Sequence, residues 1–152
     1  MPRATSGVLD GNIHLFPIRV YYEETDAGRM AHHAVFLKYA ERARTEMMRM
    51  AGLQNIGLMA DGELLFTVHS VDIRYIEQAR LDDELMVRTR VTSSKGASIT
   101  MNQLVFRIAS GTSGDAIAEI DLRMALVDNS GRPRRFPAQI KAVLDDLRDE
   151  EG

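Results

Sequence analysis

A group of side chains between residues 21 and 34 has the composition of a hydrolytic site. Asp26 is followed by Gly28 and then by a histidine pair, His32 and His33, at the point where a helical pattern begins. The first turn of a helix leaves backbone N–H groups unpaired, and these carry about half a positive charge and suit an oxyanion. A carbonyl group docked there would be polarised. Asp26 would then attack its carbon directly or activate a water molecule against it.

The same residues can also be explained without a catalytic role. Thr25 to Gly28 is a good turn sequence by itself. His32 and His33 could form a metal pair, although adjacent side chains point in different directions and no third ligand follows at helical spacing. Glu41, farther along the helix, is a rival for the catalytic base and also fits a solvated or ion-paired glutamate. The spacing alone leaves these alternatives open.

Hydrophobic periodicity predicts the elements that position this group. Residues 16–22 alternate as a half-buried strand does, and residues 34–51 carry an apolar stripe at spacings of three and four, which predicts a long helix ended by Gly52. A short helical turn is expected around Met59. Further strands are predicted at residues 63–75, 83–93, 98–109 and 116–128, with a bend at His69-Ser70, a turn at residues 110–115 and a short terminal helix containing Ile140, Val143, Leu144 and Leu147.

Consecutive strands joined by short Gly-containing turns predict antiparallel pairing. The long helix must then lie across one face of the sheet, because both elements bury their apolar sides in this way. We therefore predict an α+β fold of hot-dog type, an antiparallel sheet wrapped around one central helix. The core-facing set is expected to include Leu104, Phe106 and Ile108. A second set falls out of phase with the core and is expected on a face that meets another subunit: Met86, Ile99, Met101, Ile117, Ala125 and Val127.

Length and composition bound the possible functions. A chain of 152 residues forms one domain, predicted at 16–148 between a loose lead-in at 1–15 and an acidic tail at 149–152. The net charge of −3 argues against a protein that holds nucleic acid by neutralising phosphates. Cysteine is absent, which excludes disulfides and thiolate chemistry. No apolar run is long enough for membrane insertion and no secretory pattern opens the chain, so a cytoplasmic protein is expected.

Several segments together resemble the opening of a known family. They are Arg19–Tyr22 (RVYY), Glu24–Gly28 (ETDAG), His33–Ala34 and Tyr39–Met47 (YAERARTEM). This pattern is similar to that of the hot-dog acyl-CoA thioesterases of the 4-hydroxybenzoyl-CoA thioesterase family, and within it to the branch associated with the Tol-Pal envelope system of bacteria. A weaker likeness continues through residues 75–83 and 132–134. The chain departs from the pattern at Arg29-Met30-Ala31 and at His32, which bears on the acyl pocket rather than on the reaction.

The resemblance implies a role for three residues near the start of the helix. Asp26 matches the family's essential aspartate, the nucleophile or general base on a thioester. His33 matches the position whose backbone N–H polarises the thioester carbonyl, and Tyr22 matches a tyrosine near the site. Arg132 and Arg134, in a basic group with Arg135, could contact the phosphates of coenzyme A or form a surface patch without a ligand.

The resulting expectation is an acyl-CoA thioesterase that needs no metal or cofactor and releases free coenzyme A and a carboxylic acid. It would be a homo-oligomer, a dimer or a tetramer assembled from dimers, with a neighbouring subunit completing the site. Acyl carrier protein is an alternative carrier for the acyl group. The rival from another class is a non-catalytic acyl-CoA-binding regulator on the same fold. A hot-dog dehydratase would need a His and a carboxylate on the acyl β-carbon, which His33 and Glu41 match poorly.

Overall fold

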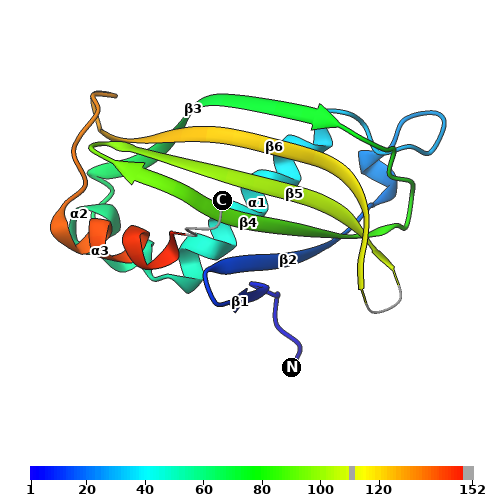
Figure 1. Cartoon of the computed structure of the whole chain (residues 1–152), viewed down its shortest axis with the longest axis horizontal. Helices are drawn as coiled ribbons and strands as arrows, with labels where there is room; N and C mark the ends of the chain where they lie inside the picture. Colours follow the sequence, from blue (N-terminus) through cyan, green and yellow to red (C-terminus); the bar gives the residue numbers. More distant parts are fainter. Residues whose placement is uncertain (110–111, 149–152) are drawn as a thin grey trace.

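The computed structural model describes residues 1–109 and 112–148, and its strands form one six-stranded antiparallel sheet in the order β1-β2-β4-β5-β6-β3 (Figure 1). The strands are β1 Val8–Asp10, β2 Ile13–Arg19, β3 Leu64–Tyr75, β4 Glu84–Lys95, β5 Ser98–Ala109 and β6 Thr112–Asp128. The helices are α1 Val35–Met50, α2 Gly57–Ala60 and α3 Ala138–Leu147, with 3-10 turns at Tyr22–Glu24 and Leu53–Asn55. This arrangement confirms the predicted α+β sheet with one long helix.

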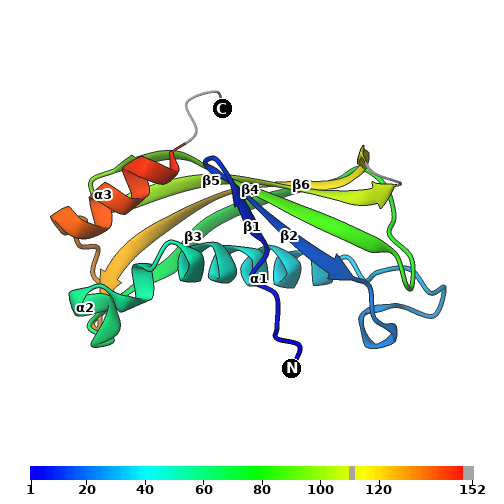
Figure 2. The ribbon, with the colours of Figure 1, turned by 90° about the horizontal axis from the view of Figure 1, so that it is seen from below.

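Helix α1 lies along one face of the curved sheet and fills its hollow (Figure 2). Its buried stripe is the predicted one, and Gly52 follows its end with a left-handed φ of 76° that suits glycine. The helix-facing side chains of the sheet pack against this stripe as one core. The buried residues of α1 are Val35, Phe36, Tyr39, Ala40, Ala43, Arg44 and Met47.

A buried polar contact joins α1 to the middle of the sheet. The side-chain amide of Gln103, on β5, donates hydrogen bonds to the carbonyl of Ala40 at 2.9 Å and to the hydroxyl of Thr89 at 3.0 Å. Its Oε1 accepts a hydrogen bond from Arg44 at 3.0 Å. Gln103 and Thr89 are fully buried. Because each of these groups would be costly to bury unpaired, the contact fixes how α1 sits along the sheet.

The predicted lead-in at residues 1–15 is wrong in part. β1 and β2 form a hairpin in which Val8 lies opposite Leu15, and the second strand begins at Ile13 rather than Phe16. It ends at Arg19, because Tyr22–Glu24 turns into a 3-10 helix. The predicted turn at 110–115 is also too long: β6 begins at Thr112, while residues 110 and 111 lie outside the described residues.

The two faces of β5 are exchanged relative to the prediction, so the side chains expected on the outer face are the ones that face the helix. In the antiparallel register, Val87 of β4 pairs with Val105, and Val91 pairs with Met101. Paired residues point to the same face of a sheet, so Ile99 and Met101 belong to the helix-facing core and not to the outer face. Both are buried. The side chains predicted for the core in this strand, Leu104, Phe106 and Ile108, are only half-buried.

The chain itself also covers one end of the sheet. Helix α3 lies beside the end where β4 and β5 join (Figure 1), and its buried residues Ile140, Leu144 and Leu147 belong to the same core as those of α1. A hydrogen bond from Ser94 to the carboxylate of Asp145 ties it to β4. The prediction of a short terminal helix is confirmed.

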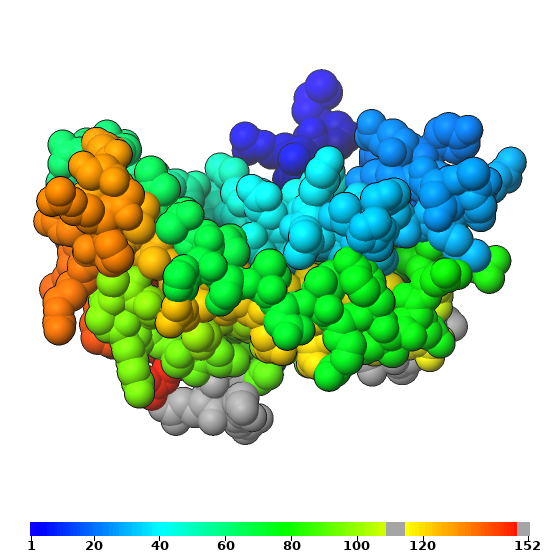
Figure 3. All heavy atoms as spheres, turned by 90° about the horizontal axis from the view of Figure 1, so that it is seen from above, coloured from blue at the N-terminus to red at the C-terminus, as the bar shows by residue number. Residues whose placement is uncertain are grey.

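Strand β3 forms one edge of the sheet and pairs only with β6 among the described strands. Its register shifts between Val68 and Ser70, which confirms the predicted bend. The side chains of β3 and the residue after it form an exposed row beside α1 (Figure 3). Five of them are apolar and between 43% and 47% exposed: Leu65, Val68, Val71, Tyr75 and Ile76.

Candidate active site

The loop between β2 and α1 is built around the carboxylate of Asp26. Oδ1 of Asp26 accepts hydrogen bonds from the backbone N–H of Gly28 at 2.8 Å and of Met30 at 3.1 Å. The backbone of Asp26 also bonds that of Met30 at 2.9 Å and of Arg29 at 3.0 Å. Oδ2 accepts no hydrogen bond from any described residue. The prediction that Thr25 to Gly28 forms a turn is therefore correct. The turn leaves the second carboxylate oxygen of Asp26 without a hydrogen bond from the described residues.

The start of α1 presents a backbone donor beside this loop. The helix is preceded by Ala34, which provides no side-chain cap. The N–H of His33 has no acceptor within residues 1–109 and 112–148, while the His33 carbonyl accepts a hydrogen bond from the Tyr75 hydroxyl at 2.7 Å. The ring of His33 stacks on His32 with centroids 4.4 Å apart. An unpaired N–H at the positive end of a helix suits a carbonyl oxygen that becomes negative.

Asp26 and His33 line one cavity of about 510 Å³. Its remaining walls come from the end of β3 and the segment after it, on the opposite side from the loop. Figure 3 shows the loop (blue) lying against this segment (green). The full lining is Asp26, Met30, Ala31, His32, His33, Phe36, Tyr75, Ile76, Glu77 and Gln78. A cavity lined by one residue with a free carboxylate oxygen and another with an unpaired N–H has the groups needed to activate and polarise an ester-like group bound in it.

Two backbone hydrogen bonds join the Asp26 loop to the segment after β3. The N–H of Ala31 donates to the carbonyl of Ala79 at 2.8 Å, and the N–H of Leu81 donates to the carbonyl of Arg29 at 2.9 Å. Met30 and Arg80 form an antiparallel bridge between them. The Asp26 loop and the segment after β3 are therefore joined as a short two-stranded ladder. Because these two segments form opposite walls of the cavity, a displacement of one is transmitted to the other.

Glu24 anchors the other side of the loop. Its Oε1 accepts hydrogen bonds from the Tyr39 hydroxyl and from the N–H of Tyr21, both at 2.9 Å, and its Oε2 lies 3.5 Å from the Arg42 guanidinium. Its carbonyl accepts from the N–H of His32. Burial, together with the Glu24 carboxylate, raises the pKa of Tyr39, so this hydroxyl stays a donor. Glu24 thus ties the loop to α1 on the far side of the cavity.

The other predicted site residues do not meet Asp26 within the chain. The Tyr22 side chain is 76% exposed and is not part of the cavity lining. Glu41 is exposed on α1 and lines other hollows. The N–H of Arg134 bonds the carbonyl of Leu126, which lies opposite Phe66 at the start of β3, whereas the cavity lies at the end of that strand. Arg132 and Arg134 are therefore at the opposite end of the molecule from Asp26 (Figure 1).

Sequence reasoning missed Tyr75, Glu24 and Arg107 as residues that shape the cavity. Glu24 carries a local signal, since a glutamate three residues after Tyr21 is placed to bond that residue's N–H. Tyr75 and Arg107 carry none, because their partners lie far away in sequence.

Two features that other functions would require are absent from residues 1–109 and 112–148. No group of three or more His, Asp or Glu side chains in it is arranged to hold a metal ion. None of its helices is both long and apolar enough to cross a lipid bilayer.

Comparison with known proteins gives consistent matches. A family model described as the thioesterase superfamily matches residues 28–113. The chain is 38% identical over 134 residues to the acyl-CoA thioesterase YbgC of Haemophilus influenzae, covering 88% of this chain and 95% of that protein. It is 36% identical over 128 residues to the acyl-CoA thioester hydrolase YbgC of Escherichia coli O157:H7, covering 84% and 92%. A probable thioesterase from Bartonella henselae superposes with a TM-score of 0.69 at 30% identity, covering 82% of this chain and 98% of that one.

Proposed function

Because this chain belongs to the thioesterase superfamily, we propose that it hydrolyses acyl-CoA thioesters and that Asp26 and the N–H of His33 perform the reaction. The products are a carboxylic acid and free coenzyme A. The observation that carries the proposal is the cavity that both residues line, where Asp26 offers an unpaired Oδ2 and His33 an unpaired N–H.

The proposed reaction proceeds by addition and elimination at the thioester carbon. The carbonyl oxygen accepts a hydrogen bond from the N–H of His33, which stabilises the negative charge that develops on it. Oδ2 of Asp26 takes a proton from a water molecule, and the water oxygen bonds to the carbon. The C–S bond then breaks, and the leaving sulfur recovers the proton from Asp26. One water molecule is consumed and the carboxylate is regenerated.

A direct attack of Asp26 on the carbon is the alternative course. It would form a mixed anhydride with Asp26, which water would then hydrolyse. The two courses differ in where the solvent oxygen goes. Under single-turnover conditions in ¹⁸O-water, the anhydride course with water attacking the Asp26 carbonyl puts label into the Asp26 side chain, whereas the general-base course puts it only into the product acid. Label in the peptide that contains Asp26, detected by mass spectrometry, would therefore identify the anhydride course.

We propose further that two copies pair through β3. A twelve-residue edge strand with a row of half-exposed apolar side chains is a template for pairing with another strand, and a second copy supplies an identical one. Antiparallel self-pairing would bring the start of β3 in one copy next to the end of β3 in the other. Arg132 and Arg134 of one copy would then lie toward the cavity of its partner, where they could meet the phosphates of coenzyme A. Light scattering tests for the dimer, and for a tetramer assembled from two such dimers.

The proposed activity is tested with a panel of acyl-CoAs of different chain length, with aromatic acyl groups and one acyl carrier protein thioester included. Release of the thiol is measured for the wild type and for Asp26→Asn, which keeps an oxygen to accept the bonds from Gly28 and Met30. Asp61→Asn, an exposed aspartate after α2, is the matched control. We expect turnover by the wild type and the control, and its near loss in Asp26→Asn.

Other outcomes would redirect the proposal. Full turnover by Asp26→Asn would move the base to another carboxylate, with Glu41 the first to test. Tight binding of acyl-CoA by the wild type, with no turnover on any substrate, would favour the non-catalytic regulator.

A further inference from the structure

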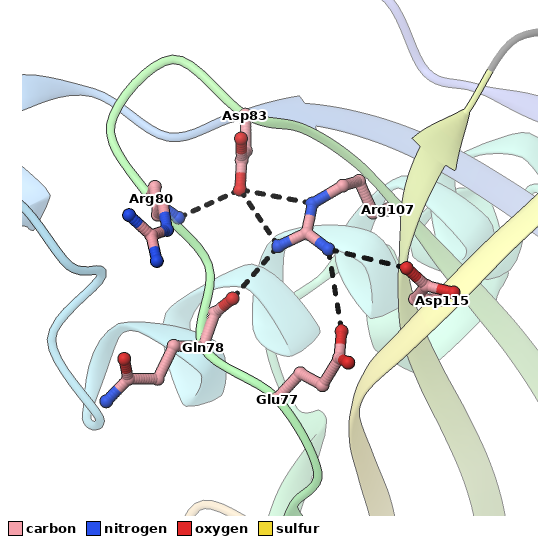
Figure 4. A network of polar contacts seen from close by, with 6 residues as sticks. All are labelled: Glu77, Gln78, Arg80, Asp83, Arg107 and Asp115. Atoms are coloured by element: carbon pink, nitrogen blue, oxygen red, sulfur yellow. Dashed lines mark hydrogen bonds and ion pairs between the residues drawn. The ribbon is translucent and has the colours of Figure 1, made fainter.

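Arg107 makes a set of contacts at the end of β5 that the reaction itself does not use (Figure 4). It pairs in register with Leu85, a fully buried residue, so its side chain starts on the helix-facing side of the sheet. Its Nη2 donates to the carbonyl of Gln78 at 2.9 Å and to Oδ2 of Asp83 at 3.2 Å, and its Nε donates to the same Oδ2 at 3.3 Å. The exposed carboxylates of Glu77 and Asp115 lie farther away, at 3.5 and 3.8 Å.

These contacts hold both ends of the segment that follows β3. Gln78 lies near its beginning and lines the cavity, and Asp83 lies at its end. Oδ2 of Asp83 also accepts the N–H of Arg80 at 2.9 Å, and the backbone of Asp83 bonds Arg80 and Val20, each at 3.0 Å. One guanidinium therefore fixes the width of the bend between residues 78 and 83.

The bend in turn carries the Asp26 loop. Ala79 and Leu81, inside it, make the two ladder bonds to Ala31 and Arg29 described above. Met30 lies between those two residues and donates its N–H to Oδ1 of Asp26. Hydrogen bonds, joined by short stretches of backbone, thus connect Arg107 through the bend to the carboxylate of Asp26, which lines the cavity. Each link is a backbone or charge-assisted bond, which leaves little freedom in the placement of that carboxylate.

We propose that Arg107 is a positioning residue for the thioester hydrolysis. Its hydrogen bonds to Gln78 and Asp83, which we call the Arg107 clamp, set the distance between the Asp26 loop and the opposite wall of the cavity. The inference rests on the proposed function for its kinetic part. Its structural part, that the clamp orders the loop, can be measured without any substrate.

The chemistry of the side chain explains why arginine is needed here. The guanidinium offers several donors in one plane, so a single side chain can reach a carbonyl and a carboxylate at once. Arg107 and Asp83 are 28% and 23% exposed, which makes their contact less screened than a surface pair. A lysine retains the charge but concentrates its donors at one atom, and a glutamine loses the charge.

The test compares Arg107→Gln and Arg107→Lys with the matched control Arg49→Gln. Arg49, near the end of α1, forms an ion pair with Glu46, is exposed, and lies outside the cavity lining and the bend. Amide hydrogen exchange is followed by NMR at Gly28, Met30, Ala31 and Leu81, the amides that build the loop and the ladder. We expect faster exchange at these amides in Arg107→Gln, a smaller change in Arg107→Lys, and none in the control.

Kinetics provide the second readout. Displacing a catalytic group by about 1 Å can cost about 100-fold in rate, so we expect kcat to fall by about 10- to 100-fold in Arg107→Gln, with KM changed much less. Partial recovery in Arg107→Lys is expected. A general loss of stability would instead speed exchange across the whole sheet and lower the active fraction, with an unchanged kcat per folded molecule.

The outcomes separate the two proposals. If exchange at Met30 and Ala31 is the same in Arg107→Gln as in the control, Arg107 does not order the loop and the inference is wrong. If exchange rises there while kcat stays at the wild-type value, the clamp exists but does not position the reaction, and the inference is again overturned. A wild type without turnover on the acyl-CoA panel contradicts the proposed function, and the exchange result then decides the structural part alone.

Discussion

Two turns at opposite ends of the molecule use the same hydrogen bonds around an aspartate. Oδ1 of Asp26 accepts the N–H of residues 28 and 30, and Oδ1 of Asp128 accepts the N–H of residues 130 and 132. The backbone N–H of each aspartate also donates to the carbonyl four residues later, at 2.9 and 3.0 Å. A local sequence that forms this turn therefore has no catalytic meaning by itself.

The two turns differ in what surrounds the second carboxylate oxygen. Oδ2 of Asp128 lies 3.6 Å from the Arg134 guanidinium, whereas Oδ2 of Asp26 has no partner among the described residues and its side chain lines the cavity. The fourth residue of each turn has a left-handed φ, of 80° at Gly131 and 62° at Arg29. Glycine adopts this conformation freely and arginine at a cost. The turn beside the cavity is the one that retains strain and an unpaired charge, and such features gather at functional sites.

The largest expected difference between the turns is in catalysis. Asp26→Asn should lower kcat/KM for acyl-CoA hydrolysis by about 10²- to 10⁴-fold, because it removes the base while keeping an Oδ1 acceptor for the turn. Asp128→Asn should stay within about twofold of the wild type, since a single exposed ion pair is worth little. Steady-state kinetics on purified variants measure both. Equal losses in the two variants would mean that the carboxylates act only through the turns.

The next difference is in stability. Gly131→Ala should lower the free energy of unfolding by about 1–2 kcal/mol, the cost of a side chain at a left-handed φ, since no atom would obstruct the new Cβ. Arg29→Gly should raise the free energy of unfolding by up to about 1 kcal/mol for the converse reason. Urea denaturation followed by circular dichroism gives both values. If Arg29→Gly destabilises the fold, the left-handed residue is not strained and the contrast between the turns is lost.

A smaller effect is expected from the arginines of the distal turn. Replacing Arg132 and Arg134 together by glutamine should raise KM for acyl-CoA by about two- to fivefold, the value of an exposed charge contact, and should leave kcat unchanged. The KM of the variant should also depend less on salt. Substrates with an acyl-pantetheine group and no nucleotide phosphates provide the control. An equal rise in KM for those substrates would show that the arginines do not contact phosphates.

The smallest effect is in the acid dependence of stability. The N–H of Arg132, followed by that of Ser130 and the Arg134 side chain, holds the pKa of Asp128 below its ordinary value of 3.8. A carboxyl with a lowered folded-state pKa stabilises the fold above its unfolded pKa, and this contribution is lost as the pH falls through the folded value. The difference in melting temperature between wild type and Asp128→Asn should therefore shrink below about pH 4. A difference that stays constant down to pH 2 would contradict the shift.

Most of the fold could be predicted from periodicity. α1 has a strong apolar stripe over four turns, and the bend in β3 is marked by a change of phase at His69. The β1–β2 hairpin was missed because β1 has only three residues and alternates weakly. The phase of β5 was reversed because both of its faces carry large apolar side chains, and only the pairing of Val105 with Val87 decides between them.

The candidate site was predicted less completely. Residue types and spacing single out Asp26 and the pair His32-His33, the resemblance to a family assigns roles to Asp26 and His33, and the structure adds that these two line one cavity. Tyr75 lines that cavity and bonds the carbonyl of His33, 42 residues away in sequence. Arg107 bonds the carbonyl of Gln78, a lining residue 29 residues away. No pattern in a single sequence predicts such contacts, because they depend on how the sheet curls around α1.

The contact of Gln103 with Ala40 has a consequence for the start of α1. The buried stripe of α1 is mostly apolar, and apolar contacts are not directional, whereas a buried amide bonded to one helix carbonyl favours a single position of the helix along the sheet. Ala40 lies seven residues, or about 10 Å, from His33. The N–H of His33, which we propose as the oxyanion donor, is therefore positioned in part by a contact in the middle of the sheet that lies outside the cavity lining.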